Sequence, residues 1–152
     1  MAARISSKQS PGSGSAQESN EPKYSIDFKA IEASRRSASF MIASRMCGRC
    51  AACAKLSKDG PAFNRPSREL MKHVVDNCAL EPAFLLPNTP VTEAVFRLLL
   101  GSGNRPMTVP EILDGLNQAW ASVIYLKNIN DEVIRRMVDR PNEYFIRKVA
   151  KS

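Results

Sequence analysis

The sequence predicts a mostly helical protein built from two small parts, and three observations support this prediction. Apolar residues recur at intervals of three and four in the segments 25–45 and 89–139, which is the period of an amphipathic helix. All four cysteines lie within residues 47–78. At 152 residues the chain forms one or two domains, each too small to build a deep core unaided. We therefore expect a metal-stabilised module followed by a three-helix domain with a short terminal strand.

The N-terminal segment, residues 1–22, consists largely of Ser, Gly, Pro and Gln and contains few large apolar side chains. Such a segment cannot bury enough surface to offset its ordering entropy, so we expect a disordered tail.

Residues 23–45 carry several cations and the pattern of an amphipathic helix that begins near Ser25. The apolar residues of this pattern are Phe28, Ile31, Met41 and Ile42. Ser37 and Ser39 weaken its middle, so two shorter helices are the alternative. Together with the cysteine stretch, this segment makes up the first predicted module, residues 23–80.

The four cysteines predict a zinc site. Zn²⁺ takes thiolate and imidazole ligands tetrahedrally, and ligands separated by two residues hold it readily. Two ligand sets agree with the spacing. One consists of Cys47, Cys50, Cys53 and Cys78. In the other, Cys50, Cys53 and Cys78 are joined by His73, which lies near Cys78 on the same helical pattern. We favour the all-cysteine set because it leaves no free thiol.

Three alternatives to a zinc site are weaker. Four buried apolar cysteines would not need three of them within seven residues. Disulfides require an oxidising compartment, which nothing in the sequence indicates, and the spacing is too short for comfortable pairing. An iron–sulfur cluster also uses cysteines at this spacing and remains the second metal hypothesis.

The knuckle formed by Cys47, Gly48, Cys50 and Cys53 resembles the opening of CXXC-type zinc fingers, chromatin modules that bind CpG-containing DNA. The segment 59–63, DGPAF, is loosely similar to a loop of that family, and Cys78 stands for its distal ligand. The family has two such knuckles and two zinc ions, so this chain matches half of a finger. BED-type fingers are the second resemblance, through GRCAAC and LMKHVVDNC. Both resemblances imply a zinc-dependent DNA-binding module.

Residues 81–88 contain two prolines and are predicted to be a connector. Residues 89–152 then show a three-helix pattern. Thr89 and Pro90 have the features of a first-helix start, and Gly101 and Gly103 those of its end.

The second and third helices of this domain have equally local signals. Thr108 and Glu111 have the spacing of a capping box ahead of the second helix. The third helix is expected at residues 131–139, and residues 143–149 alternate like a strand. This order resembles a winged helix-turn-helix that lacks the second strand of its wing. The resemblance implies a contact with DNA or with a partner subunit.

Positive charge is concentrated in the first module. Residues 23–80 contain eleven Lys/Arg against five Asp/Glu, a balance of +6 out of the net +7, whereas residues 81–152 contain nine against eight. A basic patch of this kind is the electrostatic footprint of a phosphate backbone, although a merely solvated face is the alternative. The candidate DNA contacts around the metal loops are Arg45, Arg49, Arg65, Arg68 and Lys72. Arg135 and Arg136 are candidates on the third predicted helix.

The sequence does not favour catalysis. The four ligands fill the zinc tetrahedron, a single histidine leaves no catalytic triad, and no glycine-rich phosphate loop occurs, so no small-molecule substrate is expected. No apolar run is long enough to cross a bilayer.

We expect a non-catalytic nuclear protein that binds DNA in chromatin or transcription. A faint similarity of the N-terminus to transit peptides makes the mitochondrion the alternative location. The rival function is an interaction subunit whose zinc stiffens a docking surface in a larger assembly, including one that contains RNA.

Overall fold

The computed structural model describes residues 21–48, 50–58, 60–121 and 129–150. Within these ranges the chain is mostly helical with a small three-stranded sheet, which confirms the predicted fold class at this level. Residues 1–20 of the predicted tail lie outside the described residues. No helix in the described ranges is long and apolar enough to cross a membrane. The elements in chain order are β1 (Lys23–Ile26), α2 (Phe28–Ala33), α3 (Ala38–Ala43), α4 (Ala51–Ser57), η1 (Ala62–Asn64), α5 (Ser67–Asp76), η2 (Cys78–Leu80), η3 (Pro82–Leu85), α6 (Val91–Gly101), β2 (Met107–Thr108), α7 (Val109–Ala119), α8 (Asp131–Asp139) and β3 (Ile146–Lys148).

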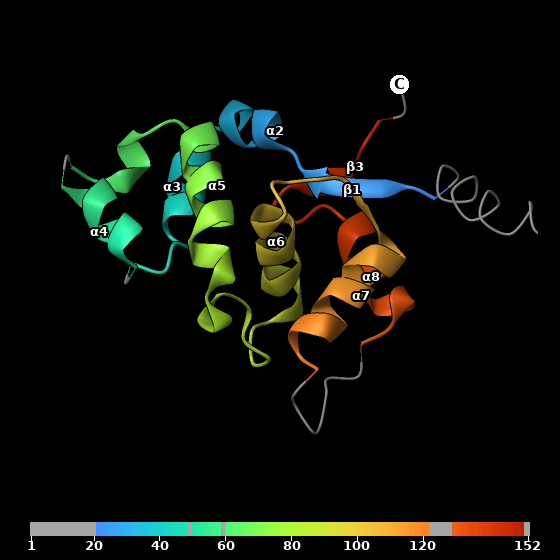
Figure 1. Ribbon diagram of the computed structural model, residues 1–152. Helices are drawn as coiled ribbons and strands as arrows, with labels where there is room; N and C mark the ends of the chain where they lie inside the picture. Colours follow the sequence, from blue (N-terminus) through green and yellow to red (C-terminus); the bar gives the residue numbers. More distant parts are fainter. Residues whose placement is uncertain (1–20, 49, 59, 122–128, 151–152) are drawn as a thin grey trace, which may run out of the picture.

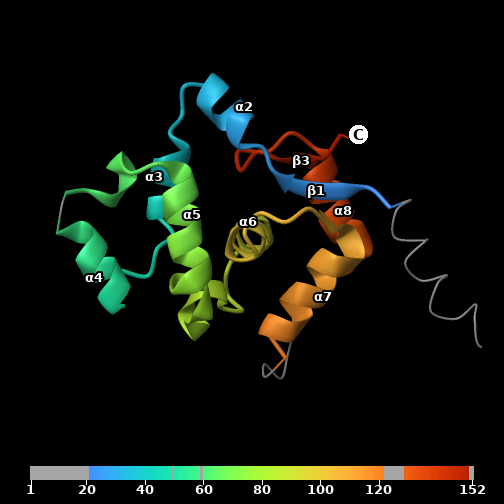
Figure 2. The same cartoon turned by 45° about the horizontal axis from the view of Figure 1, so that its top comes forward.

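Two lobes are visible in Figures 1 and 2. The first, which we name the cysteine lobe, comprises α3, α4, η1, α5 and η2, residues 38–80. The second, the three-helix lobe, comprises α6, α7 and α8 together with the sheet. Helix α5 packs against α6, so these two helices join the lobes.

The predicted helix beginning near Ser25 is wrong for its first residues, which form strand β1. Tyr24 and Ile26 are buried while Lys23 is exposed, which is the alternation of a strand with one face on a core. This strand is central in the sheet, whose order is β2–β1–β3 with both neighbours antiparallel. Residues 28–43 then form α2 and α3, the alternative of two shorter helices.

The sheet joins segments that are far apart in sequence. Tyr24 lies opposite Met107 on one side and Lys148 on the other. Three residues before β2, the side chain of Asn104 continues the pairing with β1. Its amide nitrogen donates to the Ile26 carbonyl at 2.9 Å, and its amide oxygen accepts from the Ile26 N–H at 2.8 Å. The first predicted module therefore supplies the middle strand of a sheet whose other strands belong to the predicted C-terminal domain.

The helices of the three-helix lobe begin and end close to where their local signals lie. In α7 the Thr108 side chain accepts from the Glu111 N–H at 3.2 Å and Glu111 accepts from the Thr108 N–H at 2.8 Å, which confirms the capping box. Helix α6 ends at Gly101, and Gly103 follows with a φ of +77°. The expected cap by Thr89 is wrong, because Pro90 is the N-cap and no side chain caps the helix.

The core of the protein is continuous across both lobes. In the three-helix lobe this core contains Leu116, Trp120 and Ile134, whereas Leu98 and Leu113 are only partly buried against it. The predicted connector, residues 81–88, is also partly structured: η3 buries Phe84, and the Trp120 indole donates to the Leu85 carbonyl at 3.1 Å. Residues 81–88 are thus packed against α6 and against Trp120, which follows α7.

Candidate metal centre

Three short segments deliver the four cysteines to one place. Cys47 lies in the loop after α3, where Gly48 turns the chain at a φ of +72°, a conformation that L side chains rarely adopt. Cys50 is the N-cap of α4, and Cys53 lies one turn into that helix. Cys78 begins η2, immediately after α5. The knuckle and the end of α5 therefore face each other across the cysteine lobe.

The four sulfur atoms all lie within 4.8 Å of one another. Cys53 Sγ is 3.7 Å from Cys47 Sγ and 3.6 Å from Cys78 Sγ, so these thiols are not bonded as disulfides. Ligands 2.3 Å from a tetrahedral zinc ion would be separated by about 3.8 Å. The observed separations fit four thiolates around a single ion.

Backbone N–H groups point at two of the sulfurs. The Cys53 N–H donates to Cys50 Sγ at 3.3 Å, within the first turn of α4. The Cys47 N–H donates to Cys78 Sγ at 3.3 Å and so links the knuckle to the end of α5. Such contacts to the ligand atoms orient them and offset their negative charge once a metal is bound. The chain has thus positioned these sulfurs through its own backbone.

His73 lies next to Cys53 in the structure. Its Nε2 is 3.1 Å from Cys53 Sγ, and the side chain is buried on α5. The group of mutually close ligand atoms consists of the four cysteines, which is the favoured ligand set of the two. With Cys53 as a thiolate, His73 can donate Nε2–H to the sulfur, which would make it a partner of a ligand rather than the fourth ligand.

Burial makes these thiols reluctant to ionise without a metal. Loss of water around them raises the pKa of both Cys53 and Cys78 above the usual range of a thiol. Burial also lowers the pKa of His73, which keeps its imidazole neutral. The four sulfurs are soft donors that suit Zn²⁺, and binding it would release their protons. The residues present therefore fit a bound metal ion such as Zn²⁺.

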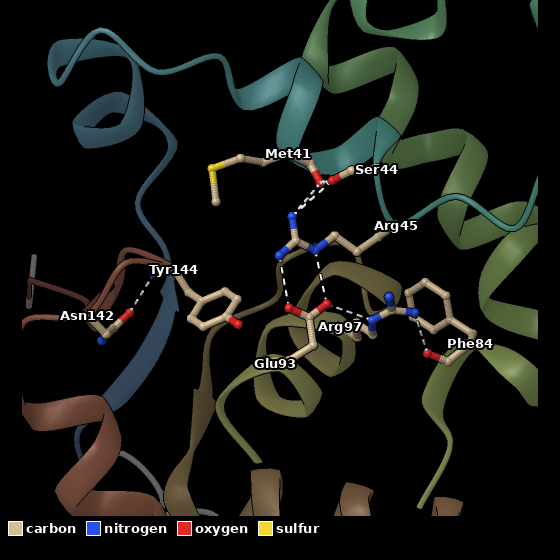
Figure 3. A network of polar contacts seen from close by, with 8 residues as sticks. All are labelled: Met41, Ser44, Arg45, Phe84, Glu93, Arg97, Asn142 and Tyr144. Carbon is tan, nitrogen blue, oxygen red and sulfur yellow. Dashed lines mark hydrogen bonds and ion pairs between the residues drawn. The ribbon is translucent and has the colours of Figure 1, made fainter. Parts of the chain in front are cut away.

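Arg45, a predicted DNA contact, is instead engaged inside the protein (Figure 3). Its guanidinium makes two contacts with Glu93 on α6, Nε to Oε2 at 3.0 Å and Nη2 to Oε1 at 2.9 Å. It also lies 4.7 Å from the ring centre of Phe96. Although burial alone would raise it, the hydrogen bonds from Arg45 and Arg97 lower the pKa of Glu93 to about 2. This pair joins the loop before Cys47 to the three-helix lobe.

No local pattern in the sequence links Glu93 to Arg45, because the two residues are 48 positions apart. Its Oε2 also accepts from Arg97 Nε at 2.8 Å, one helical turn further along α6. The i,i+4 spacing of Glu93 and Arg97 was the only local signal for this network.

The other predicted cations of the cysteine lobe lie on or beside α5. Arg65 pairs with Glu69 at 2.6 Å and Lys72 pairs with Asp76 at 2.7 Å, each over one helical turn. Arg68 is exposed near the start of the same helix. Arg49 lies outside the described residues. Three of the five predicted cations are thus together along one helix, apart from Arg45.

Arg135 and Arg136 lie on α8, in the other lobe. Arg136 is exposed and lies 3.6 Å from Glu132, whereas Arg135 is half-buried. The first turn of the helix carries Asp131 and Glu132, and Asp139 ends it. These three acids outnumber the two arginines, so α8 by itself carries no excess of positive charge.

Comparison of the chain with protein-family models, curated proteins and solved structures found no match. The chemistry of the metal centre therefore rests on its own geometry.

Proposed function

We propose that Cys47, Cys50, Cys53 and Cys78 bind one Zn²⁺ ion whose role is structural. The observation that carries this proposal is the mutual approach of four sulfurs within 4.8 Å. Four thiolates complete the tetrahedron and leave no open position for a substrate or water. The zinc would hold the knuckle and α4 against the end of α5.

We further propose that the protein is a non-catalytic DNA-binding protein of chromatin or transcription, acting in the nucleus. The support is electrostatic. Residues 33–68, which span α3, α4 and η1, contain eight Lys/Arg and a single acid, Asp59. The whole chain has a net charge of only +7. A surface this basic attracts a phosphate backbone and would release the counterions condensed on it.

Helix α5 supports phosphate contacts best. Its first turn has no side-chain cap, so backbone N–H groups remain near Arg68. The Lys72–Asp76 pair is well exposed to solvent, and the Arg65–Glu69 pair is partly exposed. Ion pairs at the surface contribute little free energy, so both cations could exchange their carboxylate partner for a phosphate. Arg45 is less suited, because a phosphate would have to displace its buried partner Glu93.

The C-terminal part is better suited to protein contacts in this proposal. The order α6, β2, α7, α8, β3 resembles a winged helix that lacks the second strand of its wing. In the sheet, β1 lies between β2 and β3 and pairs with both. The helix that would enter a DNA groove in that resemblance, α8, is the one on which acids outnumber arginines. We therefore assign the DNA contact to the cysteine lobe.

The test is the salt dependence of DNA binding by the zinc-loaded protein. Log affinity for duplex DNA should fall linearly with log salt concentration, with a slope of roughly 0.9 per phosphate contact. Arg68→Gln and Lys72→Gln should each reduce that slope by about one. Arg105→Gln is the matched control, since Arg105 is exposed but lies between α6 and β2. Unchanged affinity and slope in both helix variants would overturn the DNA-binding proposal.

The second candidate function is an interaction subunit whose zinc stiffens a docking surface. It is favoured by an open groove of about 390 Å³ between the connector and the three-helix lobe. Its apolar lining includes Phe84 and Leu98, and Leu80 at its edge is 74% exposed. This candidate takes over if the DNA-binding test fails.

A further inference from the structure

Two phenylalanines of the cysteine lobe lie on its surface and pack against each other. Phe40 on α3 is 55% exposed and Phe63 in η1 is 45% exposed. Their ring centres are 5.6 Å apart with the planes inclined at 65°, an edge-to-face arrangement. The ring that presents its edge keeps both of its faces uncovered by its neighbour. About half of each side chain is therefore available to a partner.

The two rings lie outside the buried core of the lobe. Helix α3 turns Ala38 and Ile42 toward the core, on the opposite side from Phe40. No residue of η1 is buried, although Ala62 packs partly against the core. A hydrogen bond from the Ser39 hydroxyl to the Arg65 carbonyl, 2.6 Å long, already ties α3 to the segment after η1. Because this hydrogen bond already connects the two segments, the two exposed aromatic side chains beside it indicate a binding role.

The charged residues around Phe40 and Phe63 indicate what kind of partner would bind there. Both rings belong to the stretch 33–68, in which eight cations face one acid. That acid, Asp59, and the cation Arg49 lie outside the described residues. Arg45 and Arg65 already pair with Glu93 and Glu69. An apolar protein surface would leave the other exposed cations of this stretch without counter-charges, whereas a polyanion that also carries flat apolar groups would match both features. Nucleic acid with unpaired bases has this combination.

We propose that Phe40 and Phe63 form a stacking platform for the bases of single-stranded DNA, while the cations of the same lobe contact its phosphates. This inference rests on the proposed function and narrows it. In a duplex the base faces are covered by neighbouring bases, so the rings have no counterpart there. A single strand exposes one face for each base, and stacking on an aromatic side chain tolerates any sequence.

The experiment compares a fluorescent oligothymidine with a duplex of equal length, both titrated with the zinc-loaded full chain. Phe40→Ala and Phe63→Ala should each weaken single-strand binding by about tenfold and leave duplex binding within about twofold. The salt slope should be unchanged, because no phosphate contact is lost. Phe40→Trp should retain single-strand affinity, since the indole also stacks.

Leu86→Ala is the matched control, because Leu86 is similarly exposed, 44%, but lies outside the basic stretch. Zinc content and thermal melting of each variant check that the lobe is folded. Unchanged single-strand affinity in both Phe→Ala variants would overturn the stacking platform while the Arg68 and Lys72 results uphold DNA binding. An equal loss in Phe40→Ala and Phe40→Trp would also overturn it. Absence of binding to either DNA by the wild type would overturn the proposed function and this inference together.

Discussion

The two lobes bury different kinds of side chains. In the three-helix lobe the core contains large residues from every element, among them Tyr24, Phe96, Leu116 and Trp120. Among the described residues of the cysteine lobe, no aromatic side chain other than His73 is buried, and two of the buried residues are cysteines. The cysteine lobe thus has a poor apolar core, whereas the three-helix lobe is stabilised by ordinary burial.

Helix α4 shows the difference most clearly. Among the described side chains of this helix the buried one is Cys53, and Leu56 packs only partly against the core. The helix has seven residues, and a helix this short is unstable in water without tertiary contacts. Cys50 at its N-cap and Cys53 within it are both proposed ligands. Where apolar residues are scarce, the metal would replace them as the link between short helices.

Loss of the metal should therefore produce the largest difference in stability between the two lobes. Cys53→Ser removes a central sulfur, so native mass spectrometry should find one zinc in the wild type and none in the variant. Zinc binding to small structural sites contributes about 10 kcal/mol or more. Hydrogen exchange should then lose protection in residues 38–80 and retain it in α6 and α7.

Ala51→Ser is the control for Cys53→Ser, because it adds the same hydroxyl to the exposed side of α4. It should bind zinc like the wild type. A metal-free protein that melts at the same temperature as the zinc-treated one would contradict the structural role.

A cavity-forming substitution in the three-helix lobe should have the opposite effect, lowering the stability of that lobe without changing zinc binding. Leu116 on α7 is fully buried, so Leu116→Ala should lower the free energy of unfolding by about 2–5 kcal/mol. Zinc content should be unchanged, because α7 does not carry a ligand. Asn117→Ala, at the adjacent exposed position, should cost less than about 1 kcal/mol in the same denaturant titration. A similar cost in both variants would argue against this core.

The Arg45–Glu93 pair measures how tightly the lobes are coupled. Both side chains are largely buried, at 17% and 15% exposure. Glu93→Gln should therefore cost about 2 kcal/mol by weakening the three charged hydrogen bonds that Glu93 accepts from Arg45 and Arg97. A double-mutant cycle with Arg45→Met isolates the pair. The double variant should be more stable than the sum of the single costs predicts. Additivity within about 0.5 kcal/mol would mean that the pair does not couple the lobes.

The sequence by itself determined the features that depend on near neighbours along the chain. The capping box of α7 needs only Thr108 and Glu111, three residues apart, and the end of α6 needs only a glycine run. The cysteine knuckle is equally local, because the spacing of Cys47, Cys50 and Cys53 permits them to surround one ion. Helix α8 is found at the predicted residues 131–139, because its signals also lie close together along the chain.

The tertiary structure alone decided the features whose partners are distant. Strand β1 has four residues, too few to show a period, and it exists because β2 and β3 pair with it from more than eighty residues away. The sequence predicts a DNA contact for Arg45, whereas in the structure Arg45 pairs with Glu93. The two residues are 48 positions apart, so no local pattern indicates this pair. Spacing alone does not distinguish His73 from Cys47 as the fourth ligand. The packing of α5 brings Cys78 to within 4.8 Å of the three knuckle sulfurs and places His73 next to Cys53. Long-range contacts depend on how helices pack, which no local pattern encodes.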